Sequence, residues 1–235
     1  MSDRAVRRAG AAAAIVGAVL GIVFNIVHPR SSGVGSVIDE LRLVAESRIW
    51  RFDHFMLMWS IAFTLIGLVV IGRSFDKEPA ASWGRVAIPI ALVGGTLGLA
   101  TIFADGMAVH DMATDWVANQ SDVSLASATA VSQVTLALFT ALIFVFFGLT
   151  PLLYGVAVLG SDEYPKGLGY LPIASGVLGL VAGSIQFMSG ISQLTASILF
   201  PISSVATTVW LLLMGWYLWK RSAVPAPSAP RGVIG

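Results

Sequence analysis

The sequence FADGMAVHDMATDW, residues 103–116, lies where a long apolar segment becomes polar within a few residues. The apolar segment covers about residues 86–110 and is long enough to cross a bilayer as a helix, which takes ~20 residues. Asp105 lies inside this segment, whereas His110, Asp111 and Asp115 follow at its end. The stretch therefore predicts a transmembrane helix that ends in ionisable side chains.

The composition of the whole chain supports a membrane protein. Its 235 residues are 56% hydrophobic and only 11% charged, with a mean hydropathy of +0.83, whereas soluble domains carry about 25% charge. The net charge of +1 indicates no nucleic-acid partner. The chain has no cysteine, which excludes disulfides, thiolate metal sites and iron–sulfur clusters.

Long apolar runs predict an all-α integral membrane bundle of six transmembrane helices. We expect one domain over residues 1–221, followed by a Pro/Ala-rich disordered tail at 222–235. Gly17 and Gly21, four residues apart, predict a face where another helix backbone approaches closely. The six spans are expected at about residues 9–27, 53–71, 86–110, 128–159, 168–188 and 194–219.

Two connections of the predicted bundle are polar. Val37–Arg51 has apolar residues at helical spacing opposite charged ones, and Ser36 with Asp39 resembles a capping box. This pattern predicts an amphipathic helix on the membrane surface between the first two spans, with Trp50 as an interfacial anchor. Residues 111–127 are expected to be a polar connection that begins as a continuation of the preceding helix.

The distribution of basic residues predicts the orientation. With both termini cytoplasmic, ten of the 14 Lys and Arg residues lie on the inner side and four on the outer side. We therefore expect a multi-pass plasma-membrane protein surrounded by lipid. The small-residue faces could also pack against a partner membrane subunit or a second copy of the chain.

This topology brings the polar side chains of several spans to the outer ends of the helices. Imidazole and carboxylate groups suit transition metals, and buried polar groups in a membrane suit ligand binding. We expect metal ligation from His28, His54, His110 and Asp53, and ligand contacts from Asp105, Asp111, Gln133 and Gln186.

Several functions are compatible with this cluster. The preferred hypothesis is a binding protein or accessory subunit that holds a transition metal or a small ligand. Haem ligands usually lie deeper in a bundle than His28 or His54, so a haem ranks below a metal ion. A membrane-embedded metal-dependent enzyme with Asp105 or Asp111 as its base is an alternative, and a small transporter is another. Helix caps and headgroup contacts would explain the same residues without any ligand.

Three segments also resemble a known pattern. The runs NIVHP, AESRIWRFDHF and ADGMAVHDMATDW, all in the first half of the chain, resemble a pattern of multi-pass bacterial membrane proteins to which no activity is assigned. The resemblance implies a bacterial plasma-membrane location and no particular function.

Overall fold

The computed structural model describes residues 3–29 and 36–223, and every regular element in these ranges is helical. The described residues form nine α-helices and three π-helical turns, η1 to η3, which interrupt the longer helices. The elements are α1 (Asp3–Val27), α2 (Val37–Glu46), α3 (Trp50–Gly72), α4 (Ala80–Phe103), η1 (Ala104–Val109), α5 (His110–Asn119), α6 (Asp122–Leu142), η2 (Ile143–Leu149), α7 (Thr150–Gly160), α8 (Gly167–Ser189), η3 (Thr195–Leu199) and α9 (Phe200–Ala223).

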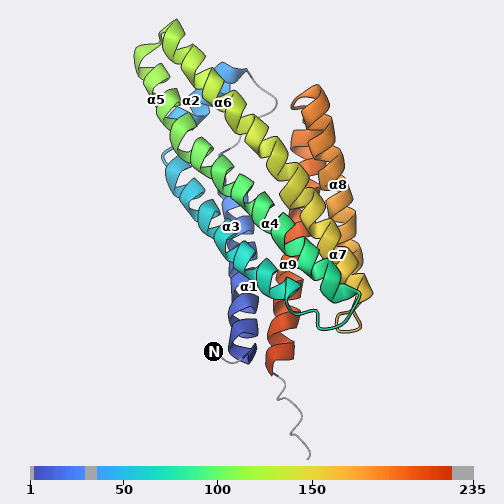
Figure 1. Cartoon of the computed structure of the whole chain (residues 1–235). Helices are drawn as coiled ribbons and strands as arrows, with labels where there is room; N and C mark the ends of the chain where they lie inside the picture. Colours follow the sequence, from blue (N-terminus) through green and yellow to red (C-terminus); the bar gives the residue numbers. More distant parts are fainter. Residues whose placement is uncertain (1–2, 30–35, 224–235) are drawn as a thin grey trace, which may run out of the picture.

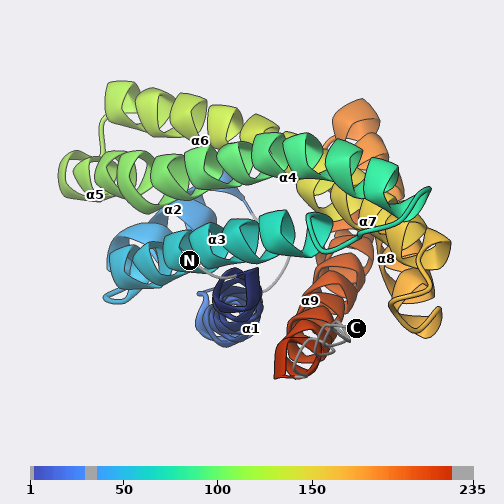
Figure 2. The same cartoon turned by 60° about the horizontal axis from the view of Figure 1, so that its bottom comes forward.

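Six continuous helices are long and apolar enough to cross a membrane. They form a closed ring in which α1 contacts α3, α3 contacts α4, α4 contacts α6 and α7, α7 contacts α8, and α9 contacts both α8 and α1 (Figures 1 and 2). A central cavity of about 130 Å³ remains between them. Both ends of the described chain lie at one end of the ring, which we call the terminal end; the opposite end is the histidine end.

Close backbone contact joins α1 to α3, as the spacing of Gly17 predicts. A Cβ at Gly17 would lie 2.6 Å from the backbone nitrogen of Thr64, and a Cβ at Gly67 would lie 2.7 Å from Ala14. Side chains at these positions would push the two helices apart. This contact fixes the position of the last residues of α1 against the first turns of α3.

The connection at residues 111–127 begins as a continuation of the preceding helix, as expected, but it is helical over almost its whole length. The helix that begins at Ala80 runs to Asn119 over 40 residues, and the next runs from Asp122 to Gly160 over 39. At 1.5 Å per residue each is about 60 Å long, twice the ~30 Å of a bilayer core. The hairpin of α5 and α6 therefore extends beyond the other helices at the histidine end (Figure 1).

Helix α2 packs against this hairpin. Its N-terminus is capped as predicted, since the Ser36 hydroxyl accepts a hydrogen bond from the Asp39 backbone N–H at 3.2 Å. Leu41 and Val44 are buried in a small apolar cluster with residues of α5 and α6, including Trp116. The apolar face of α2 thus contacts protein, whereas its charged face is exposed.

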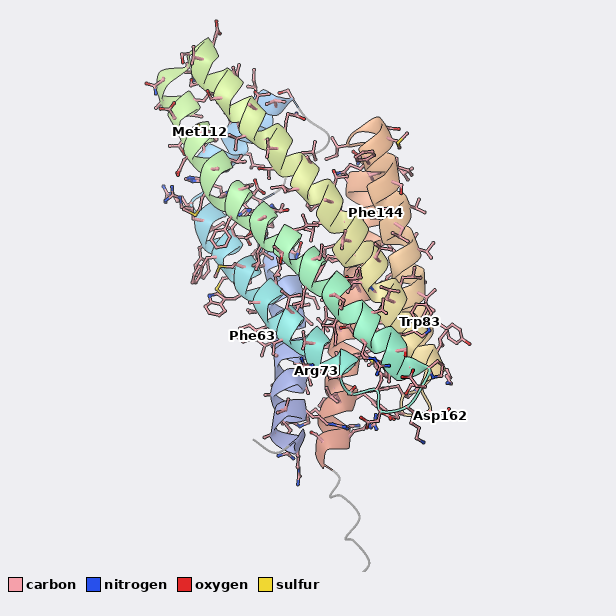
Figure 3. The ribbon with its side chains drawn as sticks, in the orientation of Figure 1. Phe63, Arg73, Trp83, Met112, Phe144 and Asp162 are labelled. Atoms are coloured by element: carbon pink, nitrogen blue, oxygen red, sulfur yellow. The ribbon has the colours of Figure 1, made fainter. Side chains whose placement is uncertain are left out.

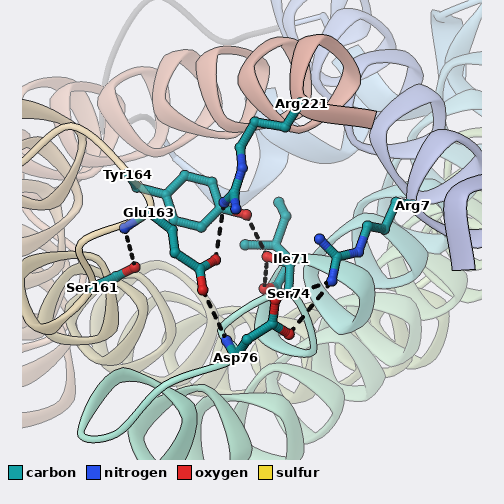
Figure 4. A network of polar contacts seen from close by, with 8 residues as sticks. All are labelled: Arg7, Ile71, Ser74, Asp76, Ser161, Glu163, Tyr164 and Arg221. Carbon is teal, nitrogen blue, oxygen red and sulfur yellow. Dashed lines mark hydrogen bonds and ion pairs between the residues drawn. The ribbon is translucent and has the colours of Figure 1, made fainter. Parts of the chain in front are cut away.

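At the terminal end, four charged side chains link segments that lie far apart in the sequence. Arg7 of α1 pairs with Asp76 at 3.2 Å, and the Asp76 backbone N–H donates to Glu163 at 3.3 Å. Glu163 in turn pairs with Arg221 of α9 at 3.0 Å (Figure 4). The network holds the α3–α4 connection, the α7–α8 connection and both terminal helices together.

Tyr164 lies at the centre of this network and is buried. Its hydroxyl contacts the Ser74 hydroxyl, and the Arg221 guanidinium lies 5.0 Å from the centre of its ring. Burial raises the pKa of the Tyr164 phenol above its ordinary value of 10.0, although the Ser74 hydrogen bond and the Arg221 charge act in the opposite direction.

Helix α9 extends two residues into the segment predicted to be a disordered tail, residues 222–235. Residues 222 and 223 belong to α9, and residues 224–235 lie outside the described part of the chain. Residues 30–35, which follow His28 and Pro29, also lie outside it.

Candidate metal centre

Three segments meet at the histidine end of the bundle. His28 follows the last residue of α1, while Asp53 and His54 lie near the start of α3, to which α1 is packed. Asp105 comes from the π-helical turn η1, which contacts α3. We call His28, Asp53, His54 and Asp105 the His/Asp cluster.

Asp53 is the most deeply buried member of the cluster, with 1% of its side chain exposed. Its Oδ2 atom lies 2.6 Å from His28 Nδ1 and 3.9 Å from His54 Nδ1. Its Oδ1 atom is buried and has no hydrogen-bond partner among the described residues. Because a buried carboxylate oxygen without a partner is costly, this oxygen indicates a cation or another donor beyond the described residues.

His54 is held in one orientation. A backbone carbonyl only accepts hydrogen bonds, so the Nδ1–H of His54 donates to the Trp50 oxygen, 2.8 Å away. Its Nε2 atom faces Asp105 Oδ2 at 3.2 Å, and one shared proton must lie between these two atoms. Metal-ligating histidines usually donate one ring N–H to a carbonyl or carboxylate in this way, which makes Nε2 the candidate ligand atom of His54 once its proton is displaced.

The π-helical turn brings Asp105 to this position. Inserting an extra residue into a helical turn changes the direction of the side chains, and such turns are frequent at functional sites. Gly106 lies directly against His54, since a Cβ there would be 2.6 Å from His54 Cβ. The indole N–H of Trp50 donates to the Asp105 backbone oxygen at 3.0 Å, which ties η1 to the start of α3.

Trp50 is therefore part of the site and not the interfacial anchor predicted from sequence. Only 4% of it is exposed, and its ring centre lies 4.7 Å from that of His54 and 5.2 Å from that of His28. The four-residue spacing between Trp50 and His54 places both on one helix face. This spacing could have indicated from sequence that Trp50 belongs to the site. It has that meaning only if the helix begins at Trp50, whereas the predicted helix began at Asp53.

A further acid lies near the cluster. Partial burial raises the pKa of the Glu40 carboxyl on α2 above its ordinary value of 4.5, and the negative charge of Asp105 raises it further. Glu40 and Asp105 thus repel one another when both are ionised. A cation bound between the helices would relieve this repulsion.

His110 and Asp111 form a separate group with Arg51. The Arg51 guanidinium contacts the Asp111 carboxylate, and its Nε–H donates to His110 Nδ1 at 3.4 Å. Both Arg51 and Asp111 are more than half exposed. The structure therefore places His110 with a surface ion pair, apart from the three donors His28, Asp53 and His54.

Gln133 and Gln186 lie elsewhere. Both line a pocket between α6 and α8, and Gln186 donates to the Thr140 hydroxyl at 2.8 Å. The sequence places all eight predicted site residues at one level of the bundle, but the ring of helices distributes them over three locations. The level of a residue along a helix does not specify which side of the ring it faces.

The donor set of the His/Asp cluster determines its chemistry. One donor atom from each of His28, Asp53 and His54 lies within 4.8 Å of the others. Four ligands at ~2.1 Å from a tetrahedral zinc ion lie about 3.4 Å apart. The three donor atoms are therefore at most roughly 1.4 Å farther apart than the ligands of a bound first-row divalent ion.

Comparison with known proteins finds no matching family, no matching curated protein and no matching solved structure.

Proposed function

We propose that this chain is a plasma-membrane protein that binds a divalent transition-metal ion, with zinc as the reference ion, in the His/Asp cluster. One observation carries the proposal: the buried Asp53 Oδ1 has no hydrogen-bond partner among the described residues, and the imidazoles of His28 and His54 lie beside the same carboxylate. A metal ion would satisfy this oxygen and replace the proton between His54 and Asp105. Imidazole and carboxylate ligands favour such ions over Mg²⁺ or Ca²⁺.

We also propose that the six apolar helices span the membrane with both termini in the cytoplasm. The ten-to-four distribution of Lys and Arg supports this orientation. The His/Asp cluster would then lie at the outer surface, where it could take up a metal ion without moving it across the membrane. The resemblance to bacterial proteins supports a bacterial plasma membrane as its location.

The observed contacts favour a binding role over the two alternatives. A transporter would need a route through the terminal end, where the network of Asp76, Glu163 and Arg221 joins four segments. An enzyme with Asp111 as its base would have to release that carboxylate from Arg51. The His/Asp cluster requires neither change to bind an ion.

Zinc binding to the purified protein tests the proposal. The protein in detergent is treated with a chelator, dialysed against buffered Zn²⁺ and analysed for zinc per chain. We expect one ion per wild-type chain and none for Asp53→Asn or His54→Gln at the same free Zn²⁺. His110→Gln is the matched control and keeps the ion, because His110 contacts Arg51 outside the cluster. Equal zinc in the wild type and both cluster variants would overturn the proposal.

A further inference from the structure

A second site lies on the side of the bundle. A pocket of about 620 Å³ opens between α6, η2 and the last turns of α8. Phe144, at the start of η2, marks its position in Figure 3 between the two helices. The pocket is separate from the His/Asp cluster, which is built from α1, α3 and η1, and its size is within the ~300–1,000 Å³ typical of ligand sites.

The pocket exists because α8 moves away from its neighbour near its end. A Cβ at Gly179 would lie 2.3 Å from the Phe147 backbone oxygen, and one at Gly183 would lie 3.0 Å from Phe144 Cβ. The two helices are thus in backbone contact up to Gly183. One turn further, the longer side chain of Gln186 bridges the gap to Thr140. The space beside this bridge is the pocket.

The orientation of the Gln186 amide follows from its neighbour. The Thr140 hydroxyl donates to the Leu136 backbone oxygen at 2.8 Å, so it can only accept from Gln186. The amide nitrogen of Gln186 therefore faces Thr140, 2.8 Å away, which leaves the amide oxygen Oε1 for a different partner. Only 4% of Gln186 is exposed, and no described residue donates a hydrogen bond to that oxygen.

The remaining lining is uncharged and mostly apolar, with Gln133 and Ser184 as further polar residues. No side chain that lines the pocket carries a formal charge, and the apolar lining residues on α6 and η2 include Leu136, Ala141, Phe144 and Val145. At 1.5 Å per residue, the stretch of helix from Gln133 to Val145 is about 18 Å long. Phe187 and Met188 at the rim are each about four-fifths exposed. In the proposed bilayer this opening would face the lipid.

We infer that the pocket binds a neutral amphiphile, whose hydroxyl head donates a hydrogen bond to Gln186 Oε1 and whose apolar chain lies along η2. A charged head would lose its hydration without gaining a counter-charge. A purely apolar chain would cover the amide oxygen without supplying a donor. The site is independent of metal binding, since the two share no residue.

Photo-crosslinking in vesicles tests this inference. The full chain is reconstituted in phosphatidylcholine vesicles with hexadecanol that carries a diazirine in its chain, and crosslinked peptides are mapped by mass spectrometry. We expect crosslinks to be concentrated in residues 133–145 and 183–191. Unlabelled hexadecanol should compete, whereas hexadecanoate, which is charged and has no hydroxyl hydrogen, should compete far less.

Three variants make the test specific. Ala137→Phe fills the pocket and should abolish the concentrated crosslinks. Gln186→Leu should weaken them about tenfold, which is the scale of one neutral hydrogen bond. Val134→Phe is the matched control, since Val134 is exposed on the same helix but does not line the pocket, and it should change nothing. Crosslinks spread evenly over the lipid-facing helices, or equal competition by hexadecanoate, would overturn the inference. A crosslinked second copy of the chain at this groove would also overturn it.

Discussion

At the scale of single residues, the candidate metal site depends on how few hydrogen-bond partners the buried Asp53 carboxylate has. This carboxylate is nearly inaccessible, with one oxygen bonded to His28 and the other without a hydrogen-bond partner in the part of the chain that the structure describes. Without a cation this arrangement is costly, because burial removes the hydration of the carboxylate. Binding a cation therefore stabilises this site more than it would stabilise an exposed pair such as Arg51 and Asp111.

Metal binding should stabilise the protein through Asp53. At a zinc concentration 100 times the Kd, binding to the folded state adds about 2.7 kcal/mol to the free energy of unfolding. Asp53→Asn keeps the size of the side chain but removes the charge, so this increase should disappear. Thermal unfolding in detergent, with and without Zn²⁺, measures it. A zinc-dependent increase that persists in Asp53→Asn would show that another site binds the ion.

Gly106 should be intolerant of a side chain. A Cβ at this position would lie 2.6 Å from His54 Cβ, so Gly106→Ala should displace the imidazole and lower zinc affinity by at least about tenfold. Gly167→Ala is the matched control, because a Cβ at Gly167 meets nothing within 4 Å. Zinc titration of both variants measures the effect. Unchanged affinity in Gly106→Ala would mean that the position of His54 does not determine binding.

At the scale of elements, two kinds of local structure differ in how well sequence predicts them. Apolar runs mark the six long helices because the bilayer requires length and hydropathy together. The π-helical turn η1 has no such pattern, yet it determines the direction of Asp105. The full helical hairpin at residues 111–127 was foreseen only at its start, because its buried residues Ala113 and Trp116 pack against α2 and not against lipid.

The same distinction applies to the candidate site. His28, Asp53 and His54 could be grouped from sequence because adjacent antiparallel helices bring consecutive ends together. The separation of His110 from them could not, since it depends on the rotation of α5 after the π-helical turn. Gln186 could not be placed either, because its partner Thr140 lies 46 residues away.

Helix α2 should detach when its buried face is reduced. Leu41→Ala removes a side chain that is 1% exposed, and such losses cost about 2–5 kcal/mol. The cost falls on the packing of α2 against α5, so hydrogen exchange should become faster in residues 37–46 while α8 stays protected. Ile38→Ala, on the exposed face of the same helix, should leave the exchange unchanged. Faster exchange throughout the bundle would contradict this local role.

At the scale of the whole molecule, the two ends of the bundle differ in chemistry. The terminal end is joined by ion pairs through Glu163, whereas the histidine end has a buried acid and two imidazoles. A candidate metal site at one end and a network of ion pairs at the other suit a protein that binds its ion at a single surface of the membrane.

The orientation of the chain can be read from cysteine labelling, since the natural sequence has no cysteine. Ala118→Cys lies exposed in the hairpin at the histidine end, and Lys77→Cys lies exposed in the α3–α4 connection. A membrane-impermeant maleimide added to intact cells should label position 118 and not position 77. Labelling of position 77 alone would place the His/Asp cluster on the cytoplasmic side.

The terminal end should lose stability at alkaline pH through Tyr164. Because burial raises the pKa of this phenol above 10.0, its contribution is fully present below pH 10 and is lost as the pH rises through the folded-state pKa. Tyr164→Phe should cost about 1 kcal/mol near pH 7, from the lost Ser74 hydrogen bond, and its unfolding temperature should fall less steeply above pH 10. If the unfolding temperatures of the wild type and Tyr164→Phe fall equally steeply above pH 10, Tyr164 does not cause the loss of stability at alkaline pH.

The most direct test of the central claim is the zinc K-edge X-ray absorption spectrum of the zinc-loaded protein. The proposed site predicts two imidazole ligands, His28 and His54, at ~2.0–2.1 Å together with oxygen ligands. His28→Ala should reduce the imidazole number to one, and His110→Ala should leave it at two. A wild-type spectrum without imidazole scattering, or a loss of imidazole in His110→Ala instead of His28→Ala, would contradict the account.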